Sequence, residues 1–575
     1  KDNDSMVAYE KLAAELNVLP EIDYERVTLM KWEYLKAVFL QSGKKTLNSS
    51  GFKEFFKANR EWLEPYAAYC CLRDIYETPD FRKWKMYSVF NPDDIAEFCA
   101  CGNIYYDKVS FYYFVQYHLH IQLLEVRDYA HAKGIVLKGD IPIGVSRDSV
   151  DAWSHPELFY MDSQAGAPPD DFSVEGQNWG FPTYNWDEMA KDGYTWWKAR
   201  FRKMAEYFDA YRIDHILGFF RIWEIPESAI QGVLGHFNPA IPFSIEELQS
   251  YGFYFDEHRH AHPYIREYML QSLFGEYAGE VIHDYLLECG YGIYALSLDF
   301  NTQRKIENHF CGKSDEKSLK IKSGLFALTD EILFVEDPYQ KRKYHPCISA
   351  RQTYSYKSLT DYERWCYDRL YVDFFYHRQD AFWKNEAMKK LPPLISSTGM
   401  LVCGEDLGMI PQSVPEVMNA LQILSLEIQR MPKDPDKEFG DVANYPYLSV
   451  CTTSTHDMSG IRAWWEEDRS KTQRYYNCIL QEQGEAPYYC EPWICEKILA
   501  MHMHSPSMLA IIPLQDWFSI DGNIRRNNPV EERINVPANP RNYWRYRMHI
   551  TIEDLLKNSD FNERIFELVR SGGRE

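Results

Sequence analysis

Arg212 and Asp214 stand two positions apart at the end of a short apolar stretch that begins near Tyr207. Alternate residues of a strand lie on the same face, so the guanidinium and the carboxylate are predicted to point the same way. The neighbouring positive charge favours the ionised form of the carboxyl group. An ionised, oriented carboxylate at the end of a strand can act as a nucleophile. A purely structural salt bridge is the alternative for this pair taken alone.

Asp140, Glu405 and Asp457 also follow short apolar stretches. Such stretches, separated by helical segments, are typical of the buried parallel strands of an α/β protein. In a (β/α)8 barrel the C-terminal ends of the strands meet at one active site. Four acidic residues at these ends, two of them with a basic neighbour, indicate glycosidic-bond chemistry, which uses paired carboxyl groups.

Five motifs of the chain resemble those of glycoside hydrolase family 77, the 4-alpha-glucanotransferases (amylomaltase, disproportionating enzyme). They are Asp140-Ile-Pro-Ile-Gly-Val, the stretch 167–182, Arg212-Ile-Asp214-His215, Gly404-Glu405-Asp406-Leu407-Gly408 and Thr455-His456-Asp457. Compact members place the acid/base glutamate soon after the nucleophile, whereas residues 227–395 intervene here. This spacing resembles the larger plant and bacterial type 2 disproportionating enzymes, which carry an inserted subdomain.

The resemblance implies a role for each site residue. Asp214 is expected to be the nucleophile, oriented by Arg212, and Glu405 the general acid and base. Asp406 is the rival to Glu405, but strand alternation places it on the opposite face. Asp457 is expected to complete the catalytic set, holding sugar hydroxyls together with His456. The further substrate-binding residues that we predict are Asp140, Asp170, Gln177, Trp179 and His215.

Two of these residues have a plain structural alternative. Trp179 lies in the stretch 167–182, which resembles the active-site loop of the family, and could instead pack within that loop. His215 could pack at the end of its strand. Residues 533–545 resemble the closing segment of the family.

The fold class that we predict is α/β, with a (β/α)8 TIM-type barrel and a large inserted subdomain. Residues 1–132 read as helical. Six strands are predicted, near residues 135–140, 209–214, 400–405, 423–428, 447–453 and 508–513. A closed barrel of this kind needs eight strands. We therefore expect the barrel to be incomplete at its N-terminus in this chain, and two strands hidden in the first 130 residues are the alternative.

This pattern divides the chain into four segments. Residues 1–132 form a helical region that flanks the barrel, and residues 133–226 form the first part of the barrel with the active-site loop. Residues 227–395 are the inserted subdomain. Residues 396–575 form the second part of the barrel and the C-terminal helix.

The composition narrows the class of partner. The 575-residue chain has a formal net charge of −22, which argues against nucleic acid or an anionic membrane and fits a neutral substrate. Thirteen cysteines without a CxxC pair are typical of reduced thiols in a cytoplasmic protein. No apolar run is long enough to span a membrane. We expect no cofactor and no metal; a solvated loop is favoured over a metal site for His258, His260 and His262.

Three functions compete. The first is retaining transfer of glucosyl units from maltose or malto-oligosaccharides to an alpha-glucan acceptor, with release of glucose. The second is hydrolysis of alpha-glucans on a related barrel, which the loop at 165–182 speaks against because it would shield the intermediate from water. The third is a non-catalytic glucan-binding fragment, which has no need to keep Asp214, Glu405 and Asp457 together.

Overall fold

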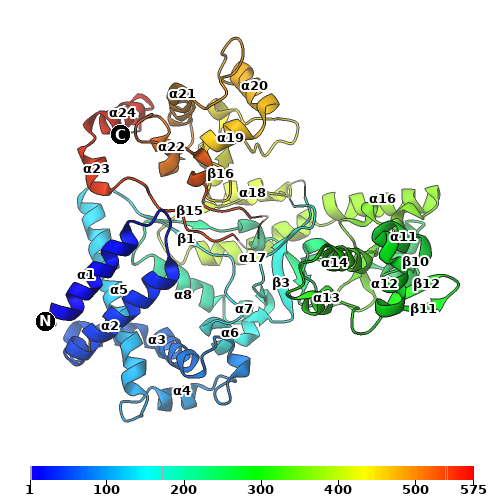
Figure 1. Cartoon of the computed structure of the whole chain (residues 1–575), viewed down its shortest axis with the longest axis horizontal. Helices are drawn as coiled ribbons and strands as arrows, with labels where there is room; N and C mark the ends of the chain where they lie inside the picture. Colours follow the sequence, from blue (N-terminus) through cyan, green and yellow to red (C-terminus); the bar gives the residue numbers. More distant parts are fainter. Residues whose placement is uncertain (1–2, 171–172, 538, 540–541, 575) are drawn as a thin grey trace.

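Short parallel strands form a row at the centre of the molecule (Figure 1). The computed structural model describes residues 3–170, 173–537, 539 and 542–574. The strands of the row are β1 (Lys138–Ile141), β6 (Ala210–Ile213), β15 (Leu401–Gly404), β16 (Ser425–Ile428), β17 (Ser449–Thr452) and β18 (Leu509–Ala510). They lie where the apolar stretches predict them, although β18 is shorter than expected and Asp140 lies within β1.

Each strand of the row pairs in parallel with the next strand along it. β6 pairs with β1 on one side and with β15 on the other. A parallel bridge between Cys403 and Leu424 connects β15 to the beginning of β16, and β17 lies between β16 and β18. Among the described residues, neither β1 nor β18 pairs with another strand at the outer edges of the row. The C-terminal ends of six neighbouring strands therefore lie together on one side.

Residues 3–132 form a bundle of helices and connecting turns, with no strand among them. The helices are α1 (Asn3–Asn17), α2 (Tyr24–Leu47), α3 (Ser50–Tyr76), α4 (Pro92–Phe98) and α5 (Tyr106–Ala132). The alternative that two barrel strands lie hidden in this region is therefore wrong. The bundle has its own apolar core, which also includes Trp153 from the loop after β1. Trp153 Nε1 donates to Tyr87 O (2.8 Å), and Tyr69 OH donates to Asp148 O (2.6 Å). The bundle thus supports the loop that follows β1.

The segment between β1 and β6 contains more regular structure than a long loop. β3 (Ser163–Ala167) pairs with β4 (Gln177–Asn178) on one side and with β7 (Ile222–Pro226) on the other, and β7 pairs with β8 (His236–Asn238). All three pairings are antiparallel. The stretch that resembles the family's active-site loop is therefore held at both ends by a sheet.

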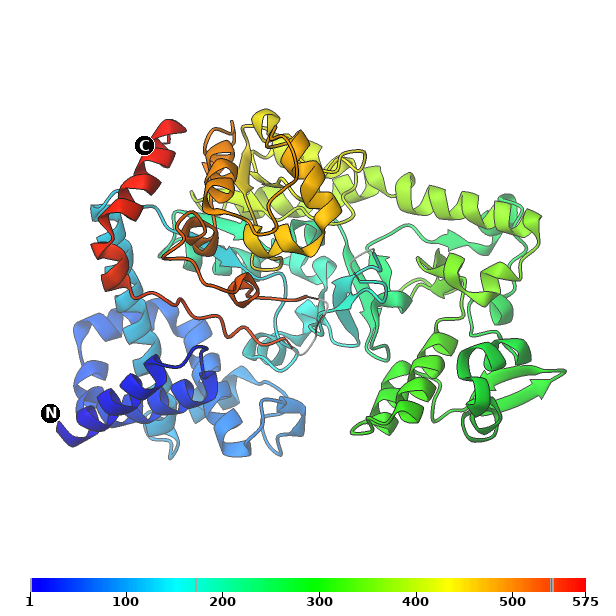
Figure 2. The same cartoon turned by 45° about the horizontal axis from the view of Figure 1, so that its top comes forward.

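A second body projects to the other side of the strand row from the helical bundle (Figures 1 and 2). Its strands pair in two small antiparallel sheets, separate from the row. One contains β9 (Phe243–Ser244), β13 (Phe334–Glu336) and β14 (Lys343–Pro346), and the other contains β10 (Ile265–Arg266), β11 (Leu286–Gly290) and β12 (Ile293–Leu296). No strand described within residues 227–395 joins the row.

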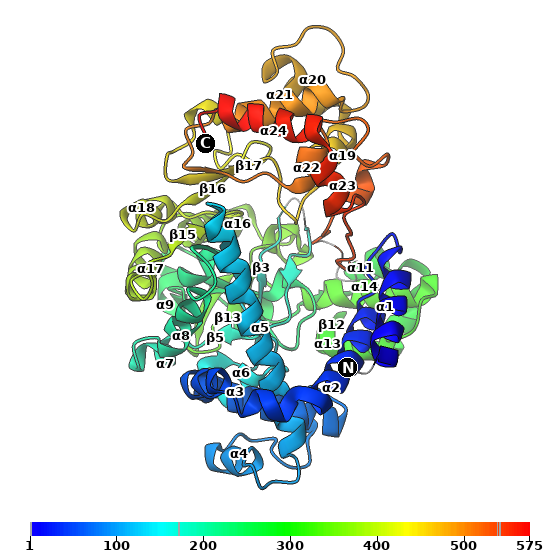
Figure 3. The ribbon, with the colours of Figure 1, turned by 90° about the vertical axis from the view of Figure 1, so that its left-hand side faces the viewer.

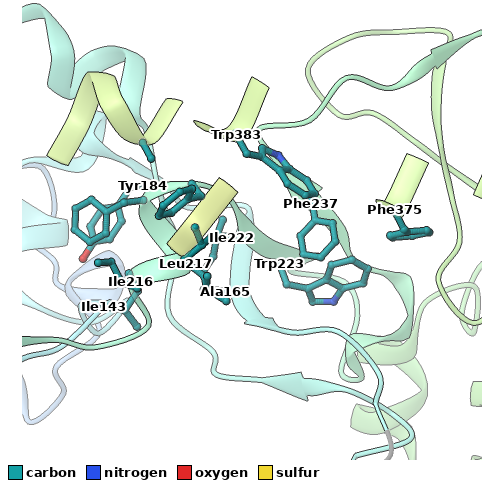
Figure 4. Close-up of a cluster of buried hydrophobic side chains, with 14 of the residues drawn as sticks. Ile143, Ala165, Tyr184, Ile216, Leu217, Ile222, Trp223, Phe237, Phe375 and Trp383 are labelled. Atoms are coloured by element: carbon teal, nitrogen blue, oxygen red, sulfur yellow. The ribbon is translucent and has the colours of Figure 1, made fainter. Parts of the chain in front are cut away.

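A continuous apolar core connects the strand row to the projecting body (Figure 4). Phe237 lies between Trp223 and Trp383, with ring centroids 4.9 Å and 5.2 Å away. Trp383 belongs to α17 (Asp380–Ile395), whose Lys390 Nζ donates to Phe219 O (3.1 Å) close to the end of β6. The same core includes Phe243, Phe334 and Tyr344 of the projecting body, so it fixes the two parts relative to each other.

The C-terminal segment returns across the molecule to the N-terminal helices (Figure 3). Ile22 N donates to Arg545 O (3.0 Å), and the Tyr24 and Tyr543 rings lie 5.7 Å apart. The expected C-terminal helix consists of two helices, α23 (Ile552–Lys557) and α24 (Ser559–Ser571). Among the described residues, no helix is both long enough and apolar enough to cross a membrane.

Candidate active site

Arg212 joins two acidic side chains at the end of the strand row. Its Nη1 lies 2.8 Å from Asp214 Oδ1 and 2.9 Å from Asp140 Oδ2. The predicted orientation of Arg212 and Asp214 on the same side of β6 is therefore confirmed. Burial raises the pKa of the Asp214 carboxyl above its ordinary value, although the Arg212 charge opposes this shift. Arg212 thus favours the ionised form of Asp214, as the sequence predicts, but burial has the larger effect on this pKa.

Glu405 follows β15 directly, and its carboxylate lies against the backbone that follows Asp214. His215 N donates to Glu405 Oε2 (3.0 Å), and Leu407 N donates to Glu405 Oε1 (3.1 Å). Burial raises the pKa of the Glu405 carboxyl to about 7. The Arg212 charge lowers this pKa and the Asp214 charge raises it. A carboxyl group with this pKa can both give and take a proton near neutral pH.

Asp406 points away from this cluster and serves the strand row. Leu426 N donates to its Oδ1 (2.8 Å), and Lys433 Nζ lies 2.7 Å from its Oδ2. Burial raises the pKa of the Asp406 carboxyl to about 6, while Lys433 opposes the shift. Both oxygens are thus held by β16 and the chain after it, as alternation along the strand predicts.

His215 adopts an unusual backbone conformation between the two carboxylates. Its φ is 47°, in the left-handed region that costs a non-glycine residue free energy. This conformation directs its N–H to Glu405. Burial lowers the pKa of the imidazole to about 3, so the ring is neutral at neutral pH.

Trp179 covers the His215 ring, with centroids 5.1 Å apart and planes at 79°. Trp179 Nε1 donates to Gln177 Oε1 (3.1 Å), so these two predicted residues act as one unit. Trp179 N also donates to Ala165 O (2.9 Å) on β3. The sheet that holds the loop therefore brings Trp179 and Gln177 to the end of β6.

Asp170 lies further along the same loop and is exposed. Its Oδ1 accepts a hydrogen bond from Ser173 N (2.7 Å). Asp171 and Phe172 of the same motif lie outside the described residues, as do Ala538, Pro540 and Arg541 of the closing segment.

His456 and Asp457 follow β17 and form a pair, with His456 Nε2 3.2 Å from Asp457 Oδ2. Burial raises the pKa of Asp457, but hydrogen bonds from His456 and Asn535 outweigh it and leave this pKa below its ordinary value. Asn535 Nδ2 donates to Asp457 Oδ1 (2.6 Å), and the Trp544 ring lies 5.1 Å from that of His456. The hydrogen bond to Asp457 raises the pKa of His456. The closing segment thus completes this part of the site.

Asn535 and Trp544 are not among the site residues predicted from the sequence. Both lie in the stretch 533–545, whose resemblance to the closing segment of the family was the available signal. Their partners His456 and Asp457 have a clearer signature, because they follow the apolar strand β17.

A cavity of about 830 Å³ opens beside Asp214. This volume lies within the range of about 300–1,000 Å³ that is typical of small-molecule sites. The lining residues include the loop at 142–148, Trp179 and Phe181. Gln164, Glu227 and Arg304 also line it, and none of these three is among the residues predicted from the sequence.

Within the described part of the chain, no group of three or more His, Cys, Asp or Glu side chains is placed to hold a metal ion. His260 is buried, and its Nδ1 accepts a hydrogen bond from Asp256 N (3.0 Å). The rings of His258 and His262 lie 6.0 Å apart. The three alternate histidines do not share one face.

Comparisons with known proteins agree with the resemblance seen in the motifs. The family model described as Glyco_hydro_77, 4-alpha-glucanotransferase, matches residues 3–552. A protein of Oryza sativa subsp. japonica named 4-alpha-glucanotransferase DPE2 is 44% identical over 559 residues. That match covers 96% of this chain and 59% of the rice protein, so the chain spans less than two thirds of this relative.

More distant relatives and solved structures extend the comparison. A protein of Chlamydia caviae named 4-alpha-glucanotransferase is 24% identical over 96% of this chain and 77% of its own length. The structure of amylomaltase from Streptococcus agalactiae in complex with acarbose covers 98% of this chain and 86% of its own, with a TM-score of 0.61 and 17% identity. The structure of amylomaltase from Corynebacterium glutamicum covers 99% of this chain and 63% of its own, with a TM-score of 0.57 and 16% identity. These two structures share the fold. Since the family model covers nearly the whole sequence and the rice relative is 44% identical, this chain belongs to glycoside hydrolase family 77, the 4-alpha-glucanotransferase family.

Proposed function

We propose that this chain carries a retaining 4-alpha-glucanotransferase activity. It transfers glucosyl units from maltose or malto-oligosaccharides to an alpha-glucan acceptor and releases glucose. The observation that carries the proposal is the pairing of two carboxyl groups with different surroundings. Asp214 is held by Arg212, whereas Glu405 has a pKa of about 7. Two such carboxyl groups on either side of a glycosidic bond are what retaining chemistry requires.

In the first step, Asp214 attacks the anomeric carbon of the donor and forms a glycosyl ester. The bond from this carbon to the glycosidic oxygen breaks, and the protonated Glu405 carboxyl gives its proton to the leaving oxygen. The Arg212 guanidinium, 2.8 Å from Asp214, keeps the attacking carboxylate in place.

In the second step, the ionised Glu405 takes the proton from a 4-hydroxyl of the acceptor. The acceptor oxygen attacks the anomeric carbon, and the bond to Asp214 breaks. Each step inverts the configuration at this carbon, so two steps retain it. The reversible role of Glu405 is supported by a pKa close to neutral pH.

Around the reacting sugar, Asp457 and His456 are proposed to hold hydroxyl groups, because the pair faces the same charged cluster from β17. The electrostatic influence of Arg212 on the pKa of both side chains supports this placement. Asp140 and the neutral His215 ring are proposed as further ligands of the same sugar. Such contacts can strengthen as the ring flattens toward the transition state.

Trp179 and Gln177 are proposed to favour transfer over hydrolysis, and Asp170 to contact the glucan from the same loop. Water competes with the acceptor for the glycosyl ester, so a bound acceptor needs a large effective concentration. A half-buried indole beside His215 provides a stacking surface for a sugar ring, and it displaces water from the site.

Incubation of the protein with maltose and glycogen tests the proposal. The expected result is one glucose for each bond transferred, with little gain in total reducing ends. Asp214→Asn should abolish both glucose release and transfer. A gain in reducing ends equal to the number of bonds broken would identify a hydrolase. Glucose release by Asp214→Asn would mean that Asp214 is not the nucleophile.

The six-strand row is proposed to belong to a (β/α)8 barrel, which is supported by its order and by the two amylomaltase structures. The segments 1–132, 133–226, 227–395 and 396–575 remain the proposed units. The end of the inserted subdomain fits better before α17, because Lys390 and Trp383 of this helix contact the row and the core beside it. The thirteen cysteines favour a cytoplasmic location.

A further inference from the structure

The inserted subdomain reaches the cavity beside Asp214 through one side chain. Arg304 lies near the beginning of α13 (Gln303–Phe310), within the proposed inserted subdomain at 227–395, and it lines the same cavity as Asp214 and Trp179. Its position in the sequence gives no sign of this, because it lies 90 positions after Asp214 (304 − 214).

Arg304 is held firmly on one side of its guanidinium. Its Nε and Nη2 donate to Glu227 O (3.2 and 3.1 Å), and Nη2 also donates to Gln164 Oε1 (3.1 Å). Among the residues that the structure describes, Nη1 has no hydrogen-bond partner. Nη1 is also not among the buried side-chain atoms that lack a partner, so it is open to solvent. The guanidinium thus has a fixed orientation and a free donor edge.

The beginning of α13 is itself anchored to the chain after β7. Gln303 is fully buried, and its Oε1 accepts from Ile230 N (2.8 Å) and Gln231 N (2.9 Å). Gln303 Nε2 donates to Asp330 Oδ1 (2.9 Å). A side chain mounted on such a support loses little conformational entropy when it binds a ligand.

The chemistry of the cavity fits a neutral, hydroxyl-rich ligand. The charged lining residues are Arg147, Arg304, Asp148, Asp214 and Glu227. Two positive and three negative charges do not favour a phosphate or another anion. Trp179 and Phe181 add aromatic surface on which sugar rings can stack. Hydroxyl oxygens can accept from the free edge of Arg304.

We propose that Arg304 binds a hydroxyl of the glucan at a sugar unit other than the one that bonds to Asp214. The inserted subdomain would thereby strengthen the binding of glucan chains long enough to reach Arg304. This inference rests on the proposed transferase function and deepens it. A hydrogen bond to a charged group contributes about 1.5–3 kcal/mol, so its loss should weaken binding by roughly 10- to 100-fold.

The test compares substrates of different length in the full-length protein. Arg304→Gln removes the free Nη1 donor, but the glutamine amide can still donate to Glu227 O. Arg304→Ala removes both. Lys305→Gln is the matched control, because Lys305 is the next residue on the same helix and donates to Leu298 O and Asn301 Oδ1. Thermal unfolding of each variant checks that the fold persists.

For Arg304→Gln, KM for maltoheptaose is expected to rise about 10-fold or more with kcat nearly unchanged, whereas KM for maltose should change less than about 3-fold. In an Asp214→Asn background, calorimetry should show the same loss of maltoheptaose binding without any catalysis. Lys305→Gln should behave like the parent. If Arg304→Ala unfolds, Arg304→Gln decides the outcome.

Two results would overturn the inference. Unchanged binding of maltoheptaose by Arg304→Gln would mean that Arg304 only connects the subdomain to the chain near Glu227. An equal loss for maltose and maltoheptaose would mean that it positions the reacting groups instead. The parent protein separates these results from a failure of the proposed function, because a hydrolase would release reducing ends before any variant is made.

Discussion

Replacement of Glu405 by glutamine removes a buried titrating group and keeps its shape. Burial raises the pKa of the Glu405 carboxyl from an ordinary value of 4.5 to about 7. At roughly 1.4 kcal/mol per pKa unit, this shift corresponds to about 3 kcal/mol. Between these two pH values the folded protein keeps a proton that the unfolded chain has released. The free energy of unfolding of the parent therefore falls as the pH rises from 4.5 through about 7.

The glutamine variant has no such pH dependence at this position. Near pH 5 it is expected to be about 1 kcal/mol less stable than the parent, because its single amide oxygen cannot accept from both His215 N and Leu407 N. Near pH 8.5 the parent carries a buried charge, and the variant should be about 2 kcal/mol more stable. Transfer should fall by roughly 10²- to 10⁴-fold at every pH, since the proton donor is lost.

Thermal unfolding at several pH values between about 5 and 8.5 measures this difference. Glu416→Gln on α18 (Ser413–Ala420) is the matched control, because the Glu416 side chain is 56% exposed and solvent screens its charge. The difference between Glu405→Gln and the parent should change sign across the range, whereas the control should stay within about 0.5 kcal/mol. A difference that does not vary with pH would refute the raised pKa. With a Glu405 pKa of about 7, kcat/KM of the parent should fall above about pH 7, because the acid loses its proton. A kcat/KM that does not fall there would refute the raised pKa as well.

Three other predictions concern the same site. Trp179→Ala should lower transfer to a sugar acceptor more than bond cleavage, which glucose and reducing-end assays separate; equal losses would contradict its proposed role. Asn535→Ala removes a donor from the Asp457 carboxylate, so the pKa of Asp457 should rise and the acidic limb of the pH–rate profile should move to higher pH. An unmoved limb would show that Asp457 is not one of the groups that set it. In a crystal structure with bound oligosaccharide, the carboxyl oxygens of Asp214 and Glu405 should lie roughly 5–5.5 Å apart, and a separation near 9 Å would indicate inversion.

The strand row and the residues at its ends could be read from the sequence because both have local signatures. A parallel strand buried on both faces is a continuous apolar run, so a charged residue at its end stands out. All six predicted strands are present, and Arg212 contacts Asp214 because alternate residues share a face. The opposite orientation of Asp406, toward Lys433, follows from the same alternation.

The sheet that supports Trp179 had no comparable signature. β3 consists of Ser163-Gln-Ala-Gly-Ala167, a run of small and polar residues that resembles a loop. It becomes a strand because β7 pairs with it, although nearly 60 residues separate the two in the chain. Arg304 was missed for the same reason, since its place in the cavity depends on how α13 docks after β7.

The ionisation of Asp214 and Glu405 depends partly on neighbours that the sequence reveals and partly on the tertiary structure. The positive partner of Asp214 lies two positions away and could be identified from the sequence. The removal of water from Asp214 and Glu405 depends on packing between segments far apart in the chain, and it raises the pKa of both groups. Residue types and spacing thus determined which groups could react. Only the packing determined that Glu405, with a pKa of about 7, can carry the proton.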